Sequence, residues 1–204
     1  MQGWMLLANA RSTSADDPDF PPGWTRNPSS WGDRLPIVAL AMVGFFIALY
    51  LGLYQLDVFS DIWEPFFGDG SRTILDSRIS NILPIPDAML GAAGYLADAV
   101  AGVIGGVKRW RTMPWIVIVF GLLVGPFGIV SIALVMSQPI VLDAWCTLCL
   151  ASAVVSLAMI GPAADEVLAS LQYLRRERDR GRSLWDALWG FNNPPEPEVR
   201  VAAA

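Results

Sequence analysis

The sequence contains no histidine and only two cysteines among its 204 residues, and both shortages restrict the possible chemistry. Histidine is the commonest metal ligand and the usual general base, so its absence excludes a Ser-His-Asp triad. Two cysteines alone cannot complete a tetrahedral structural zinc site. We therefore expect no metal centre and no hydrolase of the triad type.

Charged residues are also scarce. They make up 16% of the chain, whereas soluble domains average about 25%. Hydrophobic residues reach 54% and gather in four stretches in which Asp98 is the only charge away from the ends. About 20 apolar residues, rising 1.5 Å each, span the roughly 30 Å hydrocarbon core of a bilayer. The sequence predicts an all-α integral membrane protein, a four-helix bundle with spans at about 35–56, 86–107, 113–137 and 141–162.

The segments outside the spans are more polar and differ in composition. A long loop joins the first two spans; its aromatic turn precedes apolar residues at helical spacing, which predicts a half-helix that caps the bundle. A charged stretch after the fourth span predicts an amphipathic helix on the membrane surface. The predicted parts are an N-terminal arm at 1–34, a membrane domain at 35–163 with its loop at 57–85, an amphipathic helix at 164–191 and a tail at 192–204.

The basic residues are distributed unevenly between the two predicted faces. One face holds both chain ends and the loop near residue 110, and it carries Arg11, Arg26, Arg34, Lys108, Arg109, Arg111, Arg175, Arg176, Arg178, Arg180, Arg182 and Arg200. The other face carries only Arg72 and Arg78. By the positive-inside rule the first face is cytoplasmic. We expect a multi-pass protein of a bacterial inner (plasma) membrane, in contact with lipid, whose N- and C-termini are cytoplasmic.

The two cysteines form the strongest chemical signal. Cys146 and Cys149 are three residues apart, so both thiols lie on one face of a helix and can close a disulfide. We expect Asp143 to cap the fourth span, which would put Cys146 in its first turn, where the helix dipole favours a thiolate. The outer face of a bacterial membrane is also where disulfides persist. The pair indicates redox chemistry; the alternative is two inert or structural cysteines.

Two carboxylates fall in the second span. Asp87 lies at its mouth, where helix capping alone is a sufficient explanation. Asp98 lies about halfway along it, and a carboxyl at membrane depth is costly, which makes it a functional candidate. We leave open whether Asp98 is structural or handles protons. In the loop, Ser71 and Ser77 are assigned by default to turns or caps.

Together these features resemble the vitamin K epoxide reductase family over about residues 35–162. The run 66–77, from Phe-Phe-Gly-Asp-Gly to Leu-Asp-Ser, and the run Leu-Pro-Ile-Pro-Asp-Ala-Met-Leu-Gly at 83–91 are similar to the family's loop and the start of its second helix. Trp-Cys-Thr-Leu-Cys-Leu-Ala-Ser-Ala at 145–153 is similar to its redox motif. The family passes electrons from a thioredoxin-like protein to a quinone.

The resemblance implies roles for particular residues. Cys149 would face the quinone ring, and Cys146 would be attacked by the incoming thiolate. Asp87 falls where vertebrate relatives have a quinone-binding Asn, and Ser77 matches a loop hydroxyl of bacterial members. A planar quinone also requires an aromatic wall near the cysteines. The aromatic residues that either pack or form this wall are Trp63, Phe66, Phe67 and Trp145.

Two departures from the family pattern affect this interpretation. Most members carry a second cysteine pair in the outer loop, which relays electrons to the Cys-x-x-Cys pair; this loop has none, and Ser71 stands about where the second of that pair would be. A partner thiolate would therefore have to reach Cys146 directly. The Tyr that vertebrate members place four residues after the second Cys is Ala153 here.

Three functions come into consideration for this sequence. The first is a membrane thiol–disulfide oxidoreductase that couples the Cys146–Cys149 pair to a quinone, menaquinone or ubiquinone, and exchanges with an extracytoplasmic thioredoxin-like partner. The second is a non-enzymatic structural or assembly subunit of a larger membrane complex. A transporter or channel fits poorly, since the spans carry one deep charge and no polar path. The acidic outer loop makes nucleic acid an unsuitable partner.

Overall fold

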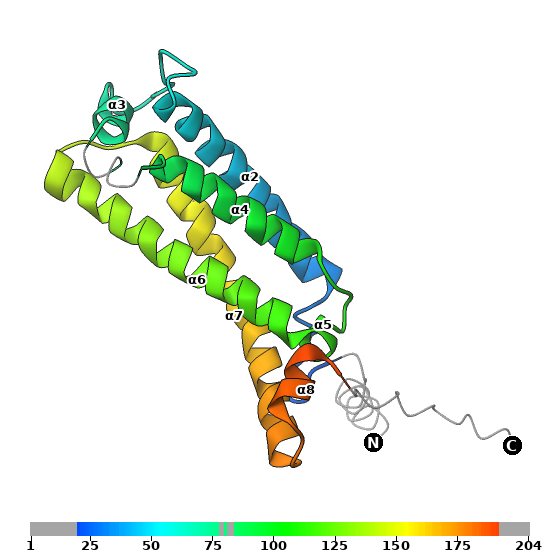
Figure 1. Cartoon of the computed structure of the whole chain (residues 1–204). Helices are drawn as coiled ribbons and strands as arrows, with labels where there is room; N and C mark the ends of the chain where they lie inside the picture. Colours follow the sequence, from blue (N-terminus) through cyan, green and yellow to red (C-terminus); the bar gives the residue numbers. More distant parts are fainter. Residues whose placement is uncertain (1–19, 78–79, 81–83, 192–204) are drawn as a thin grey trace, which may run out of the picture.

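The structure, a computed structural model, describes residues 20–77, 80 and 84–191. All regular structure in these ranges is helical (Figure 1). The elements are α2 (Trp31–Gln55), α3 (Gly70–Leu75), α4 (Asp87–Val103), α5 (Arg109–Thr112), α6 (Pro114–Ser137), the π-helix η1 (Gln138–Leu142), α7 (Thr147–Asp179) and α8 (Leu184–Trp189). Helices α2, α4, α6 and α7 form an elongated bundle, with α3 at one end and α5 and α8 at the other (Figure 1).

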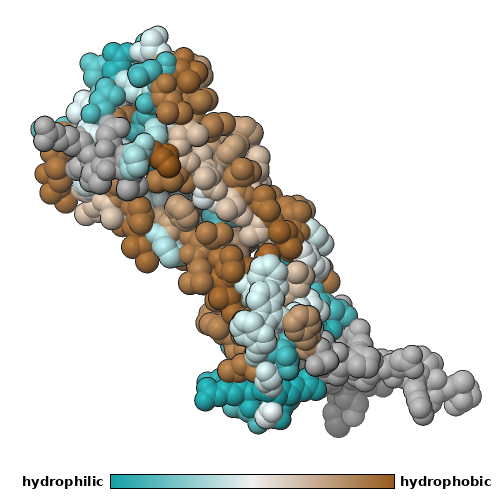
Figure 2. Space-filling view, viewed as in Figure 1, coloured by the Kyte–Doolittle hydropathy of each residue, from teal (hydrophilic) through white to brown (hydrophobic). Residues whose placement is uncertain are grey.

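Among the residues that the structure describes, three helical segments are long and apolar enough to cross a membrane: α2, α6 continued by η1, and α7. Apolar side chains cover the middle of the molecule, and polar ones gather at its ends (Figure 2). Helix α4 has 17 residues, about 25 Å at 1.5 Å per residue, which is shorter than the roughly 30 Å hydrocarbon core. It packs in the bundle against α2 and α6. The all-helical membrane architecture is confirmed, and the count of four spans stays a prediction.

Small residues, including the Gly-Ala-Ala-Gly run at 91–94, let α4 approach its neighbours closely. A Cβ atom added to Gly94 would lie 2.8 Å from the ring of Phe127 on α6. One added to Gly44 of α2 would lie 2.5 Å from the ring of Tyr95. Each ring therefore occupies the space that the side chain of any residue other than glycine would need. Tyr95 lies in the centre of the bundle and is 7% exposed.

Helix α7 differs from the prediction at both ends. Asp143 is not its N-cap; Asp143 ends η1 with a left-handed φ of 45°, and α7 starts only at Thr147, capped by Cys146. At the other end the helix continues through Pro162 to Asp179. Ala163 and residues further along are buried against the bundle, and this packing outweighs the single helical hydrogen bond that a proline removes. The predicted separate surface helix is thus mainly a continuation of α7.

Other boundaries differ less. Asp87 is the first residue of α4, and Pro86 precedes it as the N-cap without a side-chain bond. The predicted half-helix is described as α3, from Gly70 to Leu75. Its expected continuation falls partly on residues 78–79 and 81–83, which lie outside the described residues, as do the first 19 residues of the arm and the tail at 192–204.

Two buried arginines fix the end of the bundle at which α4 stops, which we call the arginine end. Arg109 donates to both carboxylate oxygens of Glu166 on α7, and both side chains are 1% exposed. Arg34 of α2 lies beside them and is 1% exposed. The two guanidinium groups also donate to the last carbonyl oxygens of α4 and the turn after it, those of Ala101, Gly102, Ile104 and Gly105. These carbonyls have no partner within the helix, so the arginines satisfy them.

Candidate functional site

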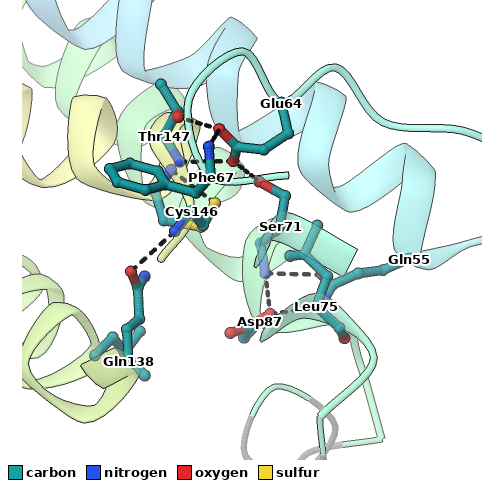
Figure 3. Close-up of a disulfide and its surroundings, with 12 residues drawn as sticks. Gln55, Glu64, Phe67, Ser71, Leu75, Asp87, Gln138, Cys146 and Thr147 are labelled. Atoms are coloured by element: carbon teal, nitrogen blue, oxygen red, sulfur yellow. Dashed lines mark hydrogen bonds between the residues drawn. A yellow bond between two sulfur atoms is a disulfide. The ribbon is translucent and has the colours of Figure 1, made fainter. Parts of the chain in front are cut away.

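The two cysteines form a disulfide at the start of α7, at the opposite end of the bundle, which we call the disulfide end. Their Cα atoms are 5.2 Å apart. Cys146 has an extended backbone, and its sulfur accepts a hydrogen bond from the backbone N–H of Cys149 at 3.1 Å. The Cys146 N–H donates to Oε1 of Gln138 in η1 at 3.3 Å (Figure 3). The π-helix therefore helps to hold the cysteine pair in place.

The two sulfurs have different surroundings. Cys146 is fully buried, 0% exposed, beneath the segment that joins α2 to α4. Cys149 is partly exposed and lines a cavity inside the bundle, whereas Cys146 does not line it. Of the two sulfurs, only that of Cys149 is therefore placed to contact a ligand in the cavity.

The cavity runs between α2, α4, α6 and α7, and most of its lining is apolar. Ser77, Ser80 and Asp87 line it near the disulfide, and Asp98 and Met159 line it deeper in the bundle. An apolar pocket with a few polar groups is the usual form of a site for a small organic molecule.

Asp87 is fixed beside the cavity by neighbouring groups. Its Oδ1 accepts a hydrogen bond from Nε2 of Gln55 at 2.8 Å and from the Ala88 N–H at 2.8 Å. The Ala88 N–H also reaches Oε1 of Gln55, at 3.3 Å (Figure 3). The first turn of α4 is therefore tied to the end of α2, with a carboxylate at the junction.

A group of hydroxyls lies further along the cavity, and sequence reasoning missed it. The Tyr95 hydroxyl is 2.7 Å from the Ser152 carbonyl oxygen, 2.9 Å from Ser152 Oγ and 2.6 Å from Ser156 Oγ. Ser131 Oγ of α6 is 3.3 Å from Ser156 Oγ. The available signal was the spacing: the two α7 serines follow Cys149 by three and seven residues, which puts them on its face of the helix.

Asp98 is the most isolated polar group of the cavity. It is 4% exposed, and its Oδ1 has no hydrogen-bond partner within the part of the chain that the structure describes. A buried polar atom without a partner is rare and requires an explanation. A ligand atom in the cavity would supply one.

The first part of the segment between α2 and α4, residues 57–77, lies over the disulfide, and we call this part the cap loop. Its Glu64 carboxylate accepts hydrogen bonds from the Thr147 N–H at 2.9 Å and from the Thr147 hydroxyl (Figure 3). It also accepts from the Ser71 hydroxyl and from the Phe66 N–H. Partial burial by itself would raise the pKa of Glu64, but these hydrogen bonds outweigh it and lower the pKa to about 2.

The cap loop also touches the backbone just before Cys146. A Cβ atom at Gly70 would lie 2.0 Å from the Trp145 carbonyl oxygen, so this contact requires glycine. The Phe67 and Trp145 rings are 6.3 Å apart between centroids. Trp63 and Phe66 are exposed, at 63% and 76%.

These positions divide the predicted quinone-binding residues into two groups. Asp87 and Ser77 line the cavity together with Cys149. Phe66, Phe67 and Trp145 lie on the cap side of the disulfide and are not part of the cavity lining. Gln55, Tyr95 and the α7 serines were not among the predicted residues.

Comparison with known proteins adds one match. The model of the vitamin K epoxide reductase family matches residues 35–163, which is well over half of the chain. No curated protein matches the sequence.

Proposed function

This chain belongs to the vitamin K epoxide reductase family, and on that premise we propose that it couples the Cys146–Cys149 pair to a quinone bound in the bundle cavity. Family membership, three helices fit to cross a membrane and the disulfide support a multi-pass membrane thiol–disulfide oxidoreductase. The observation that carries the quinone proposal is that Cys149, and not Cys146, lines the cavity.

The residues of the cavity fit a quinone. The lining is mainly apolar, which suits a lipid-soluble ring, and polar groups are available for the ring oxygens. A bound quinone would accept two electrons and two protons as the two thiols become a disulfide. Menaquinone and ubiquinone both meet this requirement.

The chain's own polar groups orient the ligand and carry protons in this proposal. Asp87 and Ser77 hydrogen-bond the ring near Cys149. Asp98, whose Oδ1 has no partner among the described residues, offers a second hydrogen bond deeper in the cavity. The Tyr95 side chain lines the same cavity, and its hydroxyl is held by hydrogen bonds with Ser152 and Ser156. It can pass a proton to or from these serine hydroxyls.

The other half-reaction occurs at Cys146 in this proposal. A thiolate of an extracytoplasmic, thioredoxin-like partner attacks the Cys146 sulfur, and Cys149 leaves as a thiolate. The second partner thiol then resolves the mixed disulfide, so the partner is oxidised and the Cys146–Cys149 dithiol is restored. We propose four spans, with the disulfide end facing outward and both termini in the cytoplasm of a bacterium, because twelve of the fourteen basic residues would then be inside.

A non-enzymatic subunit of a membrane complex is the second candidate. The absence of cysteines from the cap loop favours it, because the family's usual relay is missing from this chain. Exposed aromatics such as Trp185, 65% exposed on α8, would then serve as docking contacts.

A redox titration separates the two. The purified, reduced protein in detergent is mixed with menaquinone or ubiquinone, and free thiols are followed by maleimide gel shift. We expect quinone-dependent loss of both thiols and, with a dithiol partner, catalytic oxidation that Cys146→Ser and Cys149→Ser each abolish. Thiols that react with maleimide but stay reduced in the presence of quinone would reject the enzyme and favour the subunit.

A further inference from the structure

Cys146 is the sulfur that a partner must reach, yet it is 0% exposed. Glu64 connects the cap loop, which covers Cys146, to helix α7. Glu64 accepts two hydrogen bonds from Thr147, the residue directly after Cys146, and one from Ser71 at the start of α3 (Figure 3). One carboxylate therefore ties two parts of the cap loop to the first turn of α7.

The Glu64 contacts favour a charged carboxylate at this position. Thr147 is the first residue of α7, so its N–H has no partner within the helix, and the positive end of the helix dipole stabilises an anion there. The Phe66 N–H adds a further donor at 3.2 Å. All these groups donate, which is why a carboxylate suits the position better than an amide.

Beside Glu64, the cap loop fits tightly on the redox motif. Gly70 approaches the Trp145 carbonyl so closely that a Cβ atom would lie 2.0 Å from its oxygen. The Phe67 ring lies against the Trp145 ring on the same side. The cap thus contacts residues 145 and 147, on both sides of the buried sulfur.

We propose that Glu64 and Ser71 form a polar latch that closes the cap loop over Cys146, and that a partner thiolate reaches Cys146 only after the latch has opened. The proposal rests on the proposed function for its exchange step. Glu64 and Ser71 are positioning residues, because they act through the cap and do not touch the reacting atoms. Cys149 faces the cavity from within the bundle, so the quinone half-reaction proceeds with the latch closed.

The latch gives a role to a position where the family pattern is broken. Ser71 stands about where most relatives have the second loop cysteine. A hydroxyl cannot carry electrons, but here it donates a hydrogen bond to Glu64. The cap of this chain therefore controls access to the Cys-x-x-Cys pair instead of relaying electrons to it.

The first test measures access to Cys146 alone. In a full-length Cys149→Ser background, so that Cys146 is the single thiol, the rate of maleimide alkylation is compared with and without Glu64→Ala. Losing hydrogen bonds to a charged acceptor is expected to raise the rate about tenfold or more. Asp69→Asn is the matched control: it removes one exposed negative charge from the same loop, its side chain does not cap α3, and the rate should stay unchanged.

A pH series separates opening of the cap from a simple charge effect. Removing Glu64 also makes the Cys146 thiolate easier to form, which accelerates alkylation only below the thiol pKa. We expect the rate of the Glu64→Ala protein to remain higher at the plateau reached at high pH. Rates that converge at the plateau, or a rate unchanged at every pH, would overturn the latch.

Gly70→Ala opens the cap without changing any charge. Its Cβ atom would displace the loop from Trp145, so alkylation of Cys146 should again accelerate, and the melting temperature reports whether the protein is still folded. In the protein with both cysteines, Glu64→Ala should accelerate exchange with an external dithiol. Quinone-dependent disulfide formation, measured at the plateau reached at high pH, where the Cys146 thiol is ionised in both proteins, should stay unchanged. Failure of quinone oxidation in every variant would reject the proposed function, whereas the single-thiol alkylation result stands apart from it.

Discussion

At the arginine end, Glu166 binds Arg109 in a site where both side chains are 1% exposed, and Arg34 completes the contact with the last carbonyls of α4. At the disulfide end, Glu64 binds only neutral donors among the described residues, namely N–H and hydroxyl groups, and it is partly exposed. Both carboxylates join α7 to another part of the chain. They differ in burial and in the charge of their partners.

This difference separates a permanent joint from a movable one. Breaking a buried ion pair leaves an uncompensated charge, so the arginine end cannot open without a large loss of stability. Water can replace the donors of Glu64 when the cap loop moves, so the disulfide end can open at moderate cost. The proposed function requires this arrangement, because one end must hold the cavity and the other must be reached by a partner.

Breaking the arginine end should produce the largest effect. Glu166→Gln removes the negative partner of Arg109 and should lower the free energy of unfolding by about 3–5 kcal/mol. Asp165→Asn is the matched control; its partner Arg26 has a 51% exposed side chain, and exposed ion pairs contribute about 0–1 kcal/mol. Unfolding in detergent, followed by circular dichroism, measures both. Equal losses in the two variants would contradict the assignment of a permanent joint.

Arg34 tests the same end with a smaller change. Arg34→Lys keeps the positive charge but replaces a planar group that reaches the carbonyls of Gly102, Ile104 and Gly105 with a single ammonium. Loss of one hydrogen bond involving a charged group should cost about 1.5–3 kcal/mol of unfolding free energy. Arg26→Lys on the surface should cost less than 1 kcal/mol, about the limit for exposed pairs. A stability of Arg34→Lys equal to that of the unmodified protein would show that the fork geometry is not needed.

The sequence predicted the features that depend on local pattern. Apolar runs predicted the long helices, and the spacing of Cys146 and Cys149 predicted a disulfide that the structure contains. Family resemblance over residues 35–162 agrees with the match at 35–163. These signals are read within one helix or one motif, so no tertiary information is needed.

The missed features depend on residues far apart in the chain. In the sequence Glu64 is one of several acids of the outer loop, and nothing local indicates that it meets Thr147, 83 residues later. The Asp143 cap was wrong because the π-helix η1 ends there with a left-handed turn and delays the start of α7. Burial of Ala163 and its neighbours carries α7 past Pro162, and burial is decided by the whole bundle.

A third substitution, with a smaller expected effect, changes the cavity that Cys149 lines. Asp98→Asn keeps the shape of a carboxyl whose Oδ1 has no hydrogen-bond partner among the described residues, but it removes the acid that donates or accepts a proton. One hydrogen bond contributes about 0.5–1.5 kcal/mol, so the quinone concentration for half-maximal thiol oxidation should rise by up to about tenfold. The rate of Cys146 alkylation should not change.

Asp143→Asn is the control for Asp98. Asp143 is exposed, lies outside the cavity lining and has a left-handed φ that asparagine tolerates. Its replacement should leave the quinone dependence unchanged. If Asp98→Asn also leaves it unchanged, Asp98 has no part in ligand binding, and its burial serves packing alone.

The smallest effect is expected when the pH is changed between 5 and 8, because opening of the cap loop should not depend on pH in this range. The pKa of Glu64 is about 2 with the cap closed, against an ordinary value of 4.5 that applies when the cap is open. Because the pKa is lowered in the closed state, the charged carboxylate stabilises that state fully when the pH is above the ordinary pKa. This stabilisation is lost as pH falls from about 4.5 toward 2.

Hydrogen exchange of the Thr147 amide, corrected for its intrinsic rate, measures the opening. Protection should be constant from pH 8 to 5 and fall below that, whereas in Glu64→Gln it should be low throughout and flat. Protection that falls between pH 7 and 5 in the unmodified protein would mean that another group controls the cap. The chain has no histidine to take that role.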